Sequence, residues 1–186
     1  WERRDRFQVR LTPLADTISL ASRGNEGPYV ISDAPDAPSS GSTGDSTEIL
    51  KALLDSRFDR TALLNVVDPV VVDHAIQAGI GATINVSVGG KLAPDFFSPA
   101  RISGYVRTIS DGNFIHKGAG YRGVEFQRGR VVVLQSGSIS LVVMERPVIQ
   151  WDLQFYRSLG LEPTDARMVV LKSPQGFRAE YGRFAE

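Results

Sequence analysis

Cysteine is absent from the 186 residues of this protein, and histidine occurs only twice. Without cysteine the chain has no disulfide framework, no thiolate zinc site, no iron–sulfur site and no cysteine nucleophile. Two histidines do not by themselves supply the three imidazoles of a His₃ zinc site, although carboxylates could complete a weaker one. These counts exclude the commonest ways in which a small domain binds a metal or performs thiol chemistry.

A net charge is also lacking, because 21 Lys and Arg balance 21 Asp and Glu. Nucleic-acid binders and proteins of the anionic membrane surface carry an excess of basic residues, so we expect neither partner. No run of about 18 apolar residues occurs, so no transmembrane helix is expected. The most apolar stretch, residues 131–144, is broken by Gln135, Ser136, Gly137 and Ser138, which favours two strands and a turn.

The chain begins at Trp1 and has neither an initiator Met nor the apolar segment of a signal peptide. We therefore expect a piece of a longer protein whose amino-terminal half is missing. The lack of a signal and of cysteine predicts a cytoplasmic location. Hydrophobic residues make up 42% of the sequence, which is typical of a globular domain, and 18 Gly with 10 Pro indicate many turns.

The first half of the chain alternates short apolar runs with helical patterns, as in a parallel sheet with crossover helices. Asp45 as N-cap and Glu48 three residues later form a capping box that is expected to open one helix. Asp68 and Pro69 open the next helix, which ends near Gly79. The predicted β-α-β-α-β unit has its strands at residues 28–33, 61–67 and 82–88, and a weaker helical pattern precedes it at residues 7–21.

The second half contains closely spaced strands with turn signals between them, which predicts an antiparallel meander. A final α-β-α segment consists of a helix over 149–159, a strand over 166–171 and a helical segment from residue 172. Since no linker or repeat divides the chain, we expect one α/β domain with a single mixed sheet over residues 1–186. The expected meander strands are residues 102–109, 124–126, 131–134 and 140–144.

A loop rich in Asp, Pro, Ser and Gly, residues 33–47, joins the first strand to the first crossover helix. Small residues let a backbone approach a ligand closely, and the free N–H groups of a helix start attract anions. The spacing is not that of a P-loop, because no Lys follows the second Gly. The competing interpretation is a loop that hydrogen-bonds to itself; convergence of Asp33, Asp36 and Asp45 on a metal is a further, weaker alternative.

Two lysines also follow predicted strands. In open α/β sheets ligands bind beyond the carboxyl ends of the parallel strands, so Lys91 of Gly89-Gly90-Lys91 is expected near Asp33 and Asp68. It would bind an anion there or form a surface salt bridge. Lys172 is followed by Ser173, but adjacent residues of an extended segment point to opposite faces, which disfavours a catalytic Ser–Lys pair. The two histidines, His74 and His116, have no metal-binding spacing and are expected to pack or face solvent.

The loop reads Asp33-x-x-Asp36-x-Pro38-x-x-Gly41-x-x-Gly44-Asp45-x-Thr47. Later landmarks follow in order: Asp68-Pro69, Ala78-Gly79-Ile80-Gly81, Gly89-Gly90-Lys91, and Lys172-Ser173 with Phe177. This pattern resembles the carboxy-terminal domain of the MlrC family, the microcystin-degradation (linearised-microcystin) metallopeptidase-like proteins. The resemblance covers nearly the whole chain. It departs from the family at Ala37, Ser39, Ser40 and Gly176, where the family has Asn, Gly, Gly and His.

In that family the zinc ligands and the catalytic residues lie in the amino-terminal domain. The resemblance therefore implies no catalytic residue, metal ligand or cofactor in this chain, and zinc in the domain that is absent. It implies an accessory domain that is not catalytic alone, packs on the amino-terminal catalytic domain of the same protein, and lines one side of the substrate cleft.

Residues at the predicted strand ends are expected to face a peptide-like substrate or the partner domain. Asp36 and Asp45 would fix the loop by accepting backbone hydrogen bonds, while Lys91 and Lys172 would bind substrate carboxylates. Two alternatives stay open: a structural module that forms homo-oligomers and touches no substrate, and a small anion-binding domain that uses the loop. The predicted ligand-binding residues are Asp36, Gly41, Gly44, Asp45, Thr47, Lys91 and Lys172.

Overall fold

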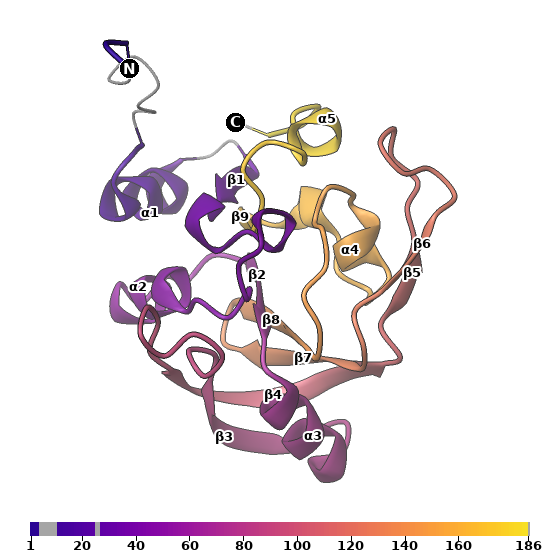
Figure 1. Ribbon diagram of the computed structural model, residues 1–186. Coiled ribbons are helices and arrows are strands. Elements are labelled where there is room, and N and C mark those ends of the chain that lie inside the picture. Colours follow the sequence, from indigo (N-terminus) through magenta and orange to yellow (C-terminus); the bar gives the residue numbers. More distant parts are fainter. Residues whose placement is uncertain (4–10, 25–26, 186) are drawn as a thin grey trace.

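The computed structural model of the protein describes residues 1–3, 11–24 and 27–185 (Figure 1). Seven strands form the main sheet, in which four parallel strands are followed by three antiparallel ones. This confirms the predicted α/β fold with a mixed sheet. In spatial order the strands are β1 (Tyr29–Ser32), β9 (Met168–Leu171), β2 (Ala62–Val67), β8 (Ile139–Met144), β7 (Val131–Ser136), β4 (Ala100–Ser110) and β3 (Thr83–Val88).

Hydrophobic cores cover both faces of this sheet, because successive residues of each strand point to opposite sides. In β2, Leu64 packs in the core beneath the first three helices, whereas Leu63 packs in the core on the other side. The first layer consists of α1 (Leu14–Arg23), α2 (Glu48–Asp55) and α3 (Pro69–Ala78). The second contains α4 (Gln154–Arg157), α5 (Arg178–Tyr181) and a small separate sheet of β5 (Asn113–Ile115) and β6 (Glu125–Gln127).

The expected third strand of the parallel unit, residues 82–88, does not lie beside the other two strands. β1 and β2 run in the same direction with β9 between them, but β3 pairs antiparallel with β4 at the far edge of the sheet. Apolar alternation specifies a strand but not its neighbour, and here the chain pairs β3 with the strand that follows it. In Figure 1 β3 and β4 run across the direction of β2, so the strongly twisted sheet brings the end of β3 back towards the end of β2.

Two helix boundaries and the pairing of one strand also differ from the prediction. The expected helix 149–159 is α-helical only from Gln154 to Arg157, where the Asp152 carboxylate accepts a hydrogen bond from the Gln154 N–H at 2.6 Å. Residues 125–127 pair with β5 and not with the meander. α1 corresponds to the later part of the expected helix 7–21, of which residues 7–10 lie outside the described residues.

A buried amide network connects β2 with the segment after β8. Asn65 donates to the Gln150 side-chain oxygen at 3.0 Å, and Gln150 donates back to Asn65 at 2.7 Å. The same Gln150 oxygen accepts the Lys172 N–H at 2.8 Å. These bonds fix the point at which the chain leaves β9, and therefore the position from which the Lys172 side chain starts.

Within the described ranges, the helices are too short or too polar for any of them to cross a membrane.

Candidate functional site

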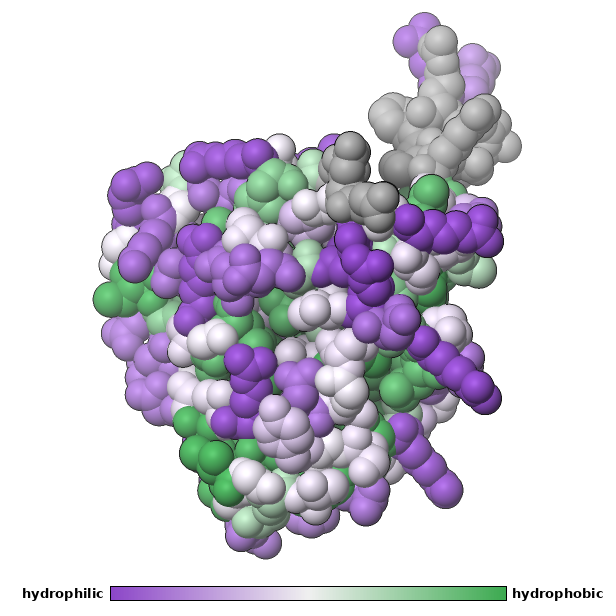
Figure 2. All heavy atoms as spheres, turned by 180° about the vertical axis from the view of Figure 1, so that it is seen from behind, coloured by the Kyte–Doolittle hydropathy of each residue, from purple (hydrophilic) through white to green (hydrophobic). Residues whose placement is uncertain are grey.

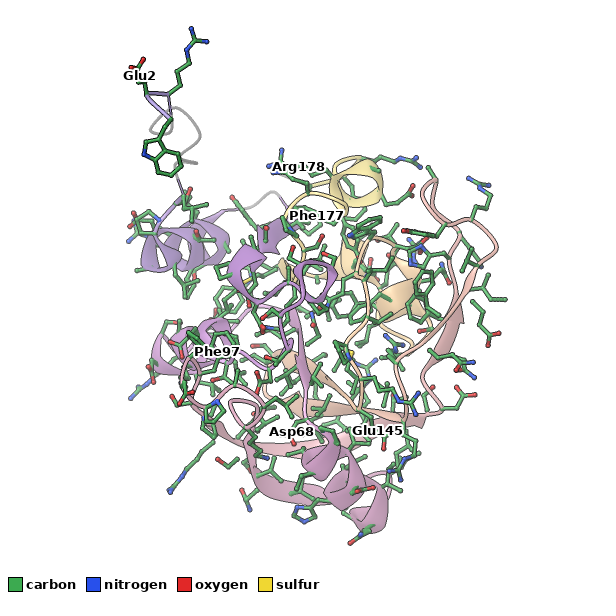
Figure 3. All side chains as sticks on the ribbon, viewed as in Figure 1. Glu2, Asp68, Phe97, Glu145, Phe177 and Arg178 are labelled. Atoms are coloured by element: carbon green, nitrogen blue, oxygen red, sulfur yellow. The ribbon has the colours of Figure 1, made fainter. Side chains whose placement is uncertain are left out.

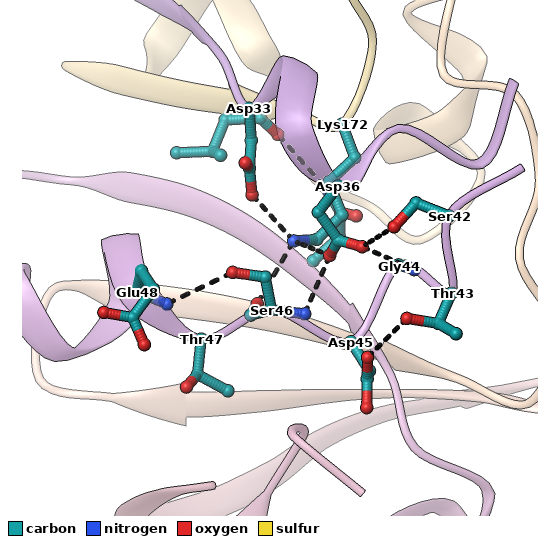
Figure 4. A network of polar contacts seen from close by, with 12 residues as sticks. Asp33, Asp36, Ser42, Thr43, Gly44, Asp45, Ser46, Thr47, Glu48 and Lys172 are labelled. Atoms are coloured by element: carbon teal, nitrogen blue, oxygen red, sulfur yellow. Dashed lines mark hydrogen bonds and ion pairs between the residues drawn. The ribbon is translucent and has the colours of Figure 1, made fainter. Parts of the chain in front are cut away.

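The loop of residues 33–47 is organised around one buried carboxylate. It folds through two short 3₁₀ turns, Ala34–Asp36 and Pro38–Ser40, and Asp36 is 0% exposed. One oxygen of Asp36 accepts the Gly44 N–H at 2.8 Å and the Ser42 hydroxyl at 2.6 Å, and the other accepts the Ser46 N–H at 2.7 Å (Figure 4). The expectation that Asp36 fixes the loop through backbone hydrogen bonds is confirmed.

Lys172 supplies the charge that balances Asp36. The Lys172 side chain is 2% exposed, and its Nζ lies 2.8 Å from Asp36, 2.9 Å from Asp33 and 3.1 Å from the Ser46 carbonyl oxygen (Figure 4). Burial by itself raises the pKa of Asp36, but Lys172, with hydrogen bonds from Ser42 and Ser46, outweighs it and lowers that pKa below its ordinary value. The ammonium is thus fully engaged by the chain's own oxygens.

Asp45 joins the loop to the segment after β3. It is 0% exposed and accepts the Lys91 N–H at 2.8 Å, the Leu92 N–H at 2.7 Å and the Thr43 hydroxyl at 2.5 Å. The expected capping box is therefore wrong: Thr47 occupies the N-cap of α2 and makes no side-chain cap bond. Asp45 does accept hydrogen bonds from backbone N–H groups, as its residue type predicts, but these groups belong to a distant segment and not to the helix that follows it.

Asp68, which directly follows β2, likewise joins two separate segments of this edge. One oxygen caps α3 by accepting the Val71 N–H at 3.1 Å, as predicted. The other accepts the Gly89 N–H at 2.9 Å and a charged bond from Lys91 Nζ at 2.7 Å. The Asp68 side chain is 1% exposed and that of Lys91 is 34% exposed, so this ion pair has one face open to solvent (Figure 3 labels Asp68).

Gly89 allows the two segments to approach this closely. Its φ is +66°, and an added Cβ would lie 2.6 Å from the Asp45 carbonyl oxygen and 2.5 Å from Thr47 Cγ2. The Gly90 N–H donates to the Asp45 carbonyl at 2.8 Å, and the Thr47 hydroxyl donates to the Ser98 carbonyl at 2.6 Å. The loop, the end of β3 and the start of β4 therefore form one interlocked edge.

An apolar hollow of about 510 Å³ opens beside this edge. Phe96, at its rim, is 83% exposed, and Gly41 adopts a left-handed conformation with φ +90° in its wall. Figure 3 shows the neighbouring Phe97, on the connection between β3 and β4, close to α2. The lining residues are Pro35, Gly41, Ser42, Thr43, Ala93, Phe96 and Phe97.

A second apolar hollow, of about 460 Å³, shares Pro35 with the first. It is lined by residues of α1, β1 and α2, and two leucines near it, Leu11 and Leu20, are 75% and 56% exposed. On the reverse face of the molecule, hydrophobic residues lie in separate small areas among hydrophilic ones (Figure 2). Scattered apolar residues are ordinary on protein surfaces, whereas two adjoining hollows mark a candidate contact face.

The sequence predicts that Asp33, Asp36, Asp45, Asp68 and Lys91 lie at this edge of the sheet. It does not predict that Ser98, Phe96 and Phe97 lie there too. Residues 93–98 form an irregular connection without a motif, and their contact with the loop depends on the tertiary fold. The two phenylalanines in a row, next to prolines in a connecting segment, were the available signal, because large apolar side chains are unusual in a solvated loop.

The histidines lie away from this edge. His74 is exposed on α3, and His116 is buried with its ring 4.4 Å from that of Phe126. Burial lowers the pKa of His116, although the carboxylates of Asp152 and Glu180 act in the opposite direction. In the part of the chain that the structure describes, no three His, Cys, Asp or Glu side chains are grouped so that they could hold a metal ion.

Replacing Lys172 by Met is expected to lower the free energy of unfolding by about 3–5 kcal/mol at pH 7, because the buried carboxylate of Asp36 loses its counter-charge. Urea denaturation measures this change. Lys51→Met removes an exposed ion pair with Glu48 and serves as the control, with an expected cost below about 1 kcal/mol. Equal losses in the two variants would contradict the role given to Lys172.

The pH dependence separates charge from packing in the same variant. The lowered pKa of Asp36 means that its ion pair stabilises the fold above the unfolded carboxyl pKa of about 3.9, and that this stability is lost as the pH falls through the lowered folded value. In Lys172→Met the hydrogen bonds from Ser42 and Ser46 remain, but Lys172 no longer offsets burial, so the pKa of Asp36 is expected to lie higher than in the wild type. The stability difference between wild type and variant is therefore expected to shrink as the pH falls from 7 towards 4; a constant difference would indicate lost packing alone.

Gly89→Ala is expected to destabilise the protein by about 2–4 kcal/mol, since it combines a left-handed backbone with a collision against the Asp45 carbonyl. Gly137→Ala is the matched control, because Gly137 has φ +55° but open space around its Cβ position. The control is expected to cost about 1–2 kcal/mol. Thermal or urea unfolding of both variants compares them, and a control as damaging as Gly89→Ala would refute the close approach.

Comparison with known proteins finds similar chains, among them a curated protein and a solved structure. Microcystinase C of Sphingomonas sp. is 27% identical over 168 residues, which cover 90% of this chain and 32% of that protein. A crystal structure of a candidate metallopeptidase from Mesorhizobium sp. BNC1 matches with a TM-score of 0.91 and 24% identity, over 100% of this chain and 37% of the other. The second likeness concerns the fold alone.

The chain thus spans about a third of the length of each of these relatives. The family model described as the MlrC C-terminus matches residues 31–186, which include the loop, both lysines and every strand of the main sheet except the first two residues of β1. With this match over most of its length, the chain belongs to the MlrC C-terminus family.

Proposed function

We propose that the chain is the accessory carboxy-terminal domain of an MlrC-like metallopeptidase or amide hydrolase. It packs on the amino-terminal catalytic domain and lines one side of the substrate cleft. Membership of the MlrC C-terminus family supports the assignment as a carboxy-terminal domain. The match covers only 32% of microcystinase C, which is consistent with that assignment. The name of microcystinase C suggests a peptide-like substrate class.

The residues of this chain would bind and position, and the other domain would perform the chemistry. The family resemblance assigns zinc to the amino-terminal domain. Within the described residues, the carboxylates of the candidate site are already bonded to backbone N–H groups and to lysines, which does not fit a metal site here. We therefore assign no step of the reaction to a metal bound by this chain.

The exposed apolar rim beside the loop is the observation that carries the proposal. Phe96 is 83% and Leu92 49% exposed, and both lie on the segment that Asp45 and Asp68 hold against the loop. Burying large apolar side chains stabilises an interface by about 25 cal/mol per Å². Exposed apolar side chains on a segment that hydrogen bonds hold in place are suited to permanent contact with a partner domain.

Lys91 is a cation of this edge whose ammonium can reach a substrate. Its ammonium is held by Asp68 but keeps one face open, whereas Lys172 is enclosed. A ligand carboxylate could add to the Lys91–Asp68 pair without breaking it. We therefore retain the carboxylate-binding role for Lys91 and give Lys172 a structural one; the ligand contacts of Gly41, Gly44 and Thr47 stay predictions.

The anion-binding alternative has less support. The backbone N–H groups of Gly44 and Ser46, which an anion would need, already donate to Asp36. The structural alternative, a module that forms homo-oligomers and touches no substrate, agrees with the buried and satisfied loop, and it predicts that Lys91 meets no substrate.

Phe96→Asp is expected to weaken the contact between the two domains. In a protein that joins this domain to its amino-terminal partner, we expect the backbone N–H groups of residues 92, 93 and 95–97 to exchange about tenfold more slowly than in this chain alone, and the variant to remove that protection. Ile115→Asp, at a 55% exposed position on β5, is the control and should keep it. Hydrogen exchange that is equally fast in both wild-type forms would count against this docking face.

Lys91→Met tests the substrate contact in the same two-domain protein. For a peptide with a free carboxylate we expect KM to rise about tenfold with kcat unchanged, as for loss of one partly exposed charged hydrogen bond. The amidated peptide should show no change, and Lys51→Met should behave like wild type. Unchanged KM and kcat on the carboxylate substrate would remove the cleft role while leaving the docking proposal intact.

A further inference from the structure

The edge strand β3 presents unpaired backbone groups. The Val106 N–H donates to the Ala82 carbonyl at 2.9 Å, and the register continues from there in steps of two residues along β4. In an antiparallel pair, alternate residues bond to the neighbour and the residues between them point outward. The N–H and C=O groups of Thr83, Asn85 and Ser87 therefore face away from β4, and among the described residues no other backbone group bonds to them.

Nothing in the sequence of β3 protects this edge. Exposed edges are normally blunted by a charged side chain, a proline, a bulge or a covering element. The six residues of β3, Thr-Ile-Asn-Val-Ser-Val, contain no charge and no proline, and their register with β4 is regular throughout. The opposite edge differs: β1 has only four residues, and α1 borders it across a shared hollow.

We propose that β3 pairs antiparallel with β3 of a second copy of this chain, about a two-fold axis at Asn85. Thr83 then faces Ser87 of the second copy, Asn85 faces its own counterpart, and each facing pair exchanges two backbone hydrogen bonds. The result is one continuous sheet across two protomers. This pairing uses the outward backbone groups of residues 83–87, whereas the proposed docking of the catalytic domain uses the apolar side chains of residues 92–97.

The side chains of the outward face are compatible with this pairing. Beside β3, Ser87 neighbours Arg101, Asn85 neighbours Ser103, and Thr83 neighbours Tyr105. The two-fold axis would place Arg101 in the same row as Tyr105 of the second copy, so no like charges oppose each other. In the view from behind, the lower part of the molecule, where β3 and β4 lie, is largely pale, the colour of intermediate hydropathy (Figure 2).

The second copy would also cover partly exposed apolar surface. Val86 is only partly buried although its neighbours Ile84 and Val88 are buried, and a hollow of about 420 Å³ runs over the β3–β4 ladder. Completing the row of strand hydrogen bonds and covering Val86 act in the same direction. A strand from a different protein would satisfy the backbone equally, but it would not use the self-complementary Thr-Asn-Ser row.

Charge placed at the two-fold axis tests the pairing. Size-exclusion chromatography with light scattering should show a dimer for the wild type and a monomer for both Asn85→Lys and Asn85→Asp, because like charges would then face each other. An equimolar mixture of the two variants should restore the dimer, since Lys would face Asp. Asn113→Lys, at an exposed asparagine on β5, is the control and should stay dimeric.

The rescue by mixing separates loss of pairing from loss of folding, because a misfolded variant would not be restored by its partner. A wild-type protein that is monomeric at all concentrations would overturn the proposal, as would a dimer that Asn85→Lys leaves intact. A monomer that captures a foreign peptide strand would likewise overturn it in favour of another occupant.

The lack of cysteine allows a second, independent test. Asn85→Cys introduces the only thiol in the chain, and facing residues of an antiparallel pair lie within disulfide range. Mild oxidation should give a covalent dimer from Asn85→Cys and none from Asn113→Cys. Equal cross-linking of both variants would show random collision and would contradict the assigned axis.

Discussion

The ammonium of Lys172, buried between Asp33 and Asp36, is the interaction on which the candidate site depends. A cation removed from water costs several kcal/mol unless charges and hydrogen bonds replace its hydration, and here two carboxylates and the Ser46 carbonyl do so. Because Lys172 follows β9 and Asp33 follows β1, this cluster ties the ends of two adjacent parallel strands to the loop. A loop of small residues with little apolar surface of its own thereby gains a fixed shape.

Similar contacts recur along the edge, where buried carboxylates accept hydrogen bonds from backbone N–H groups. Asp36 accepts them within its own loop, Asp45 from the segment after β3, and Asp68 from both α3 and Gly89. Each bond satisfies a donor that would otherwise be buried unpaired, so irregular chain can be packed here without regular secondary structure. The apolar side chains of Leu92 and Phe96 are left outside, and it is this combination that supports a domain contact.

Local patterns predicted much of the fold correctly. The α3 cap by Asp68, the end of that helix at Gly79, three of the four expected meander strands and the final strand followed from residue types with strong local preferences. Two of the errors share one cause, since both the parallel placement of β3 and the capping role of Asp45 required knowing which distant segment lies next to which. An Asp carboxylate can accept hydrogen bonds from the start of its own helix or from a distant segment such as Lys91, and sequence spacing does not distinguish the two.

The sequence by itself determined that this is a cysteine-free α/β domain without net charge, that its polar residues gather after strand ends, and that the order of its motifs resembles the MlrC carboxy-terminal domain. Only the tertiary structure decided that Lys172 is enclosed while Lys91 stays half open, that Phe96 stands exposed beside the loop, and that β3 is an unprotected edge. The physical reason is that burial and strand pairing depend on neighbours distant in sequence. A lysine after a strand has the same local sequence pattern in both cases: when two carboxylates enclose its ammonium, and when a single carboxylate binds it and leaves it partly exposed to water.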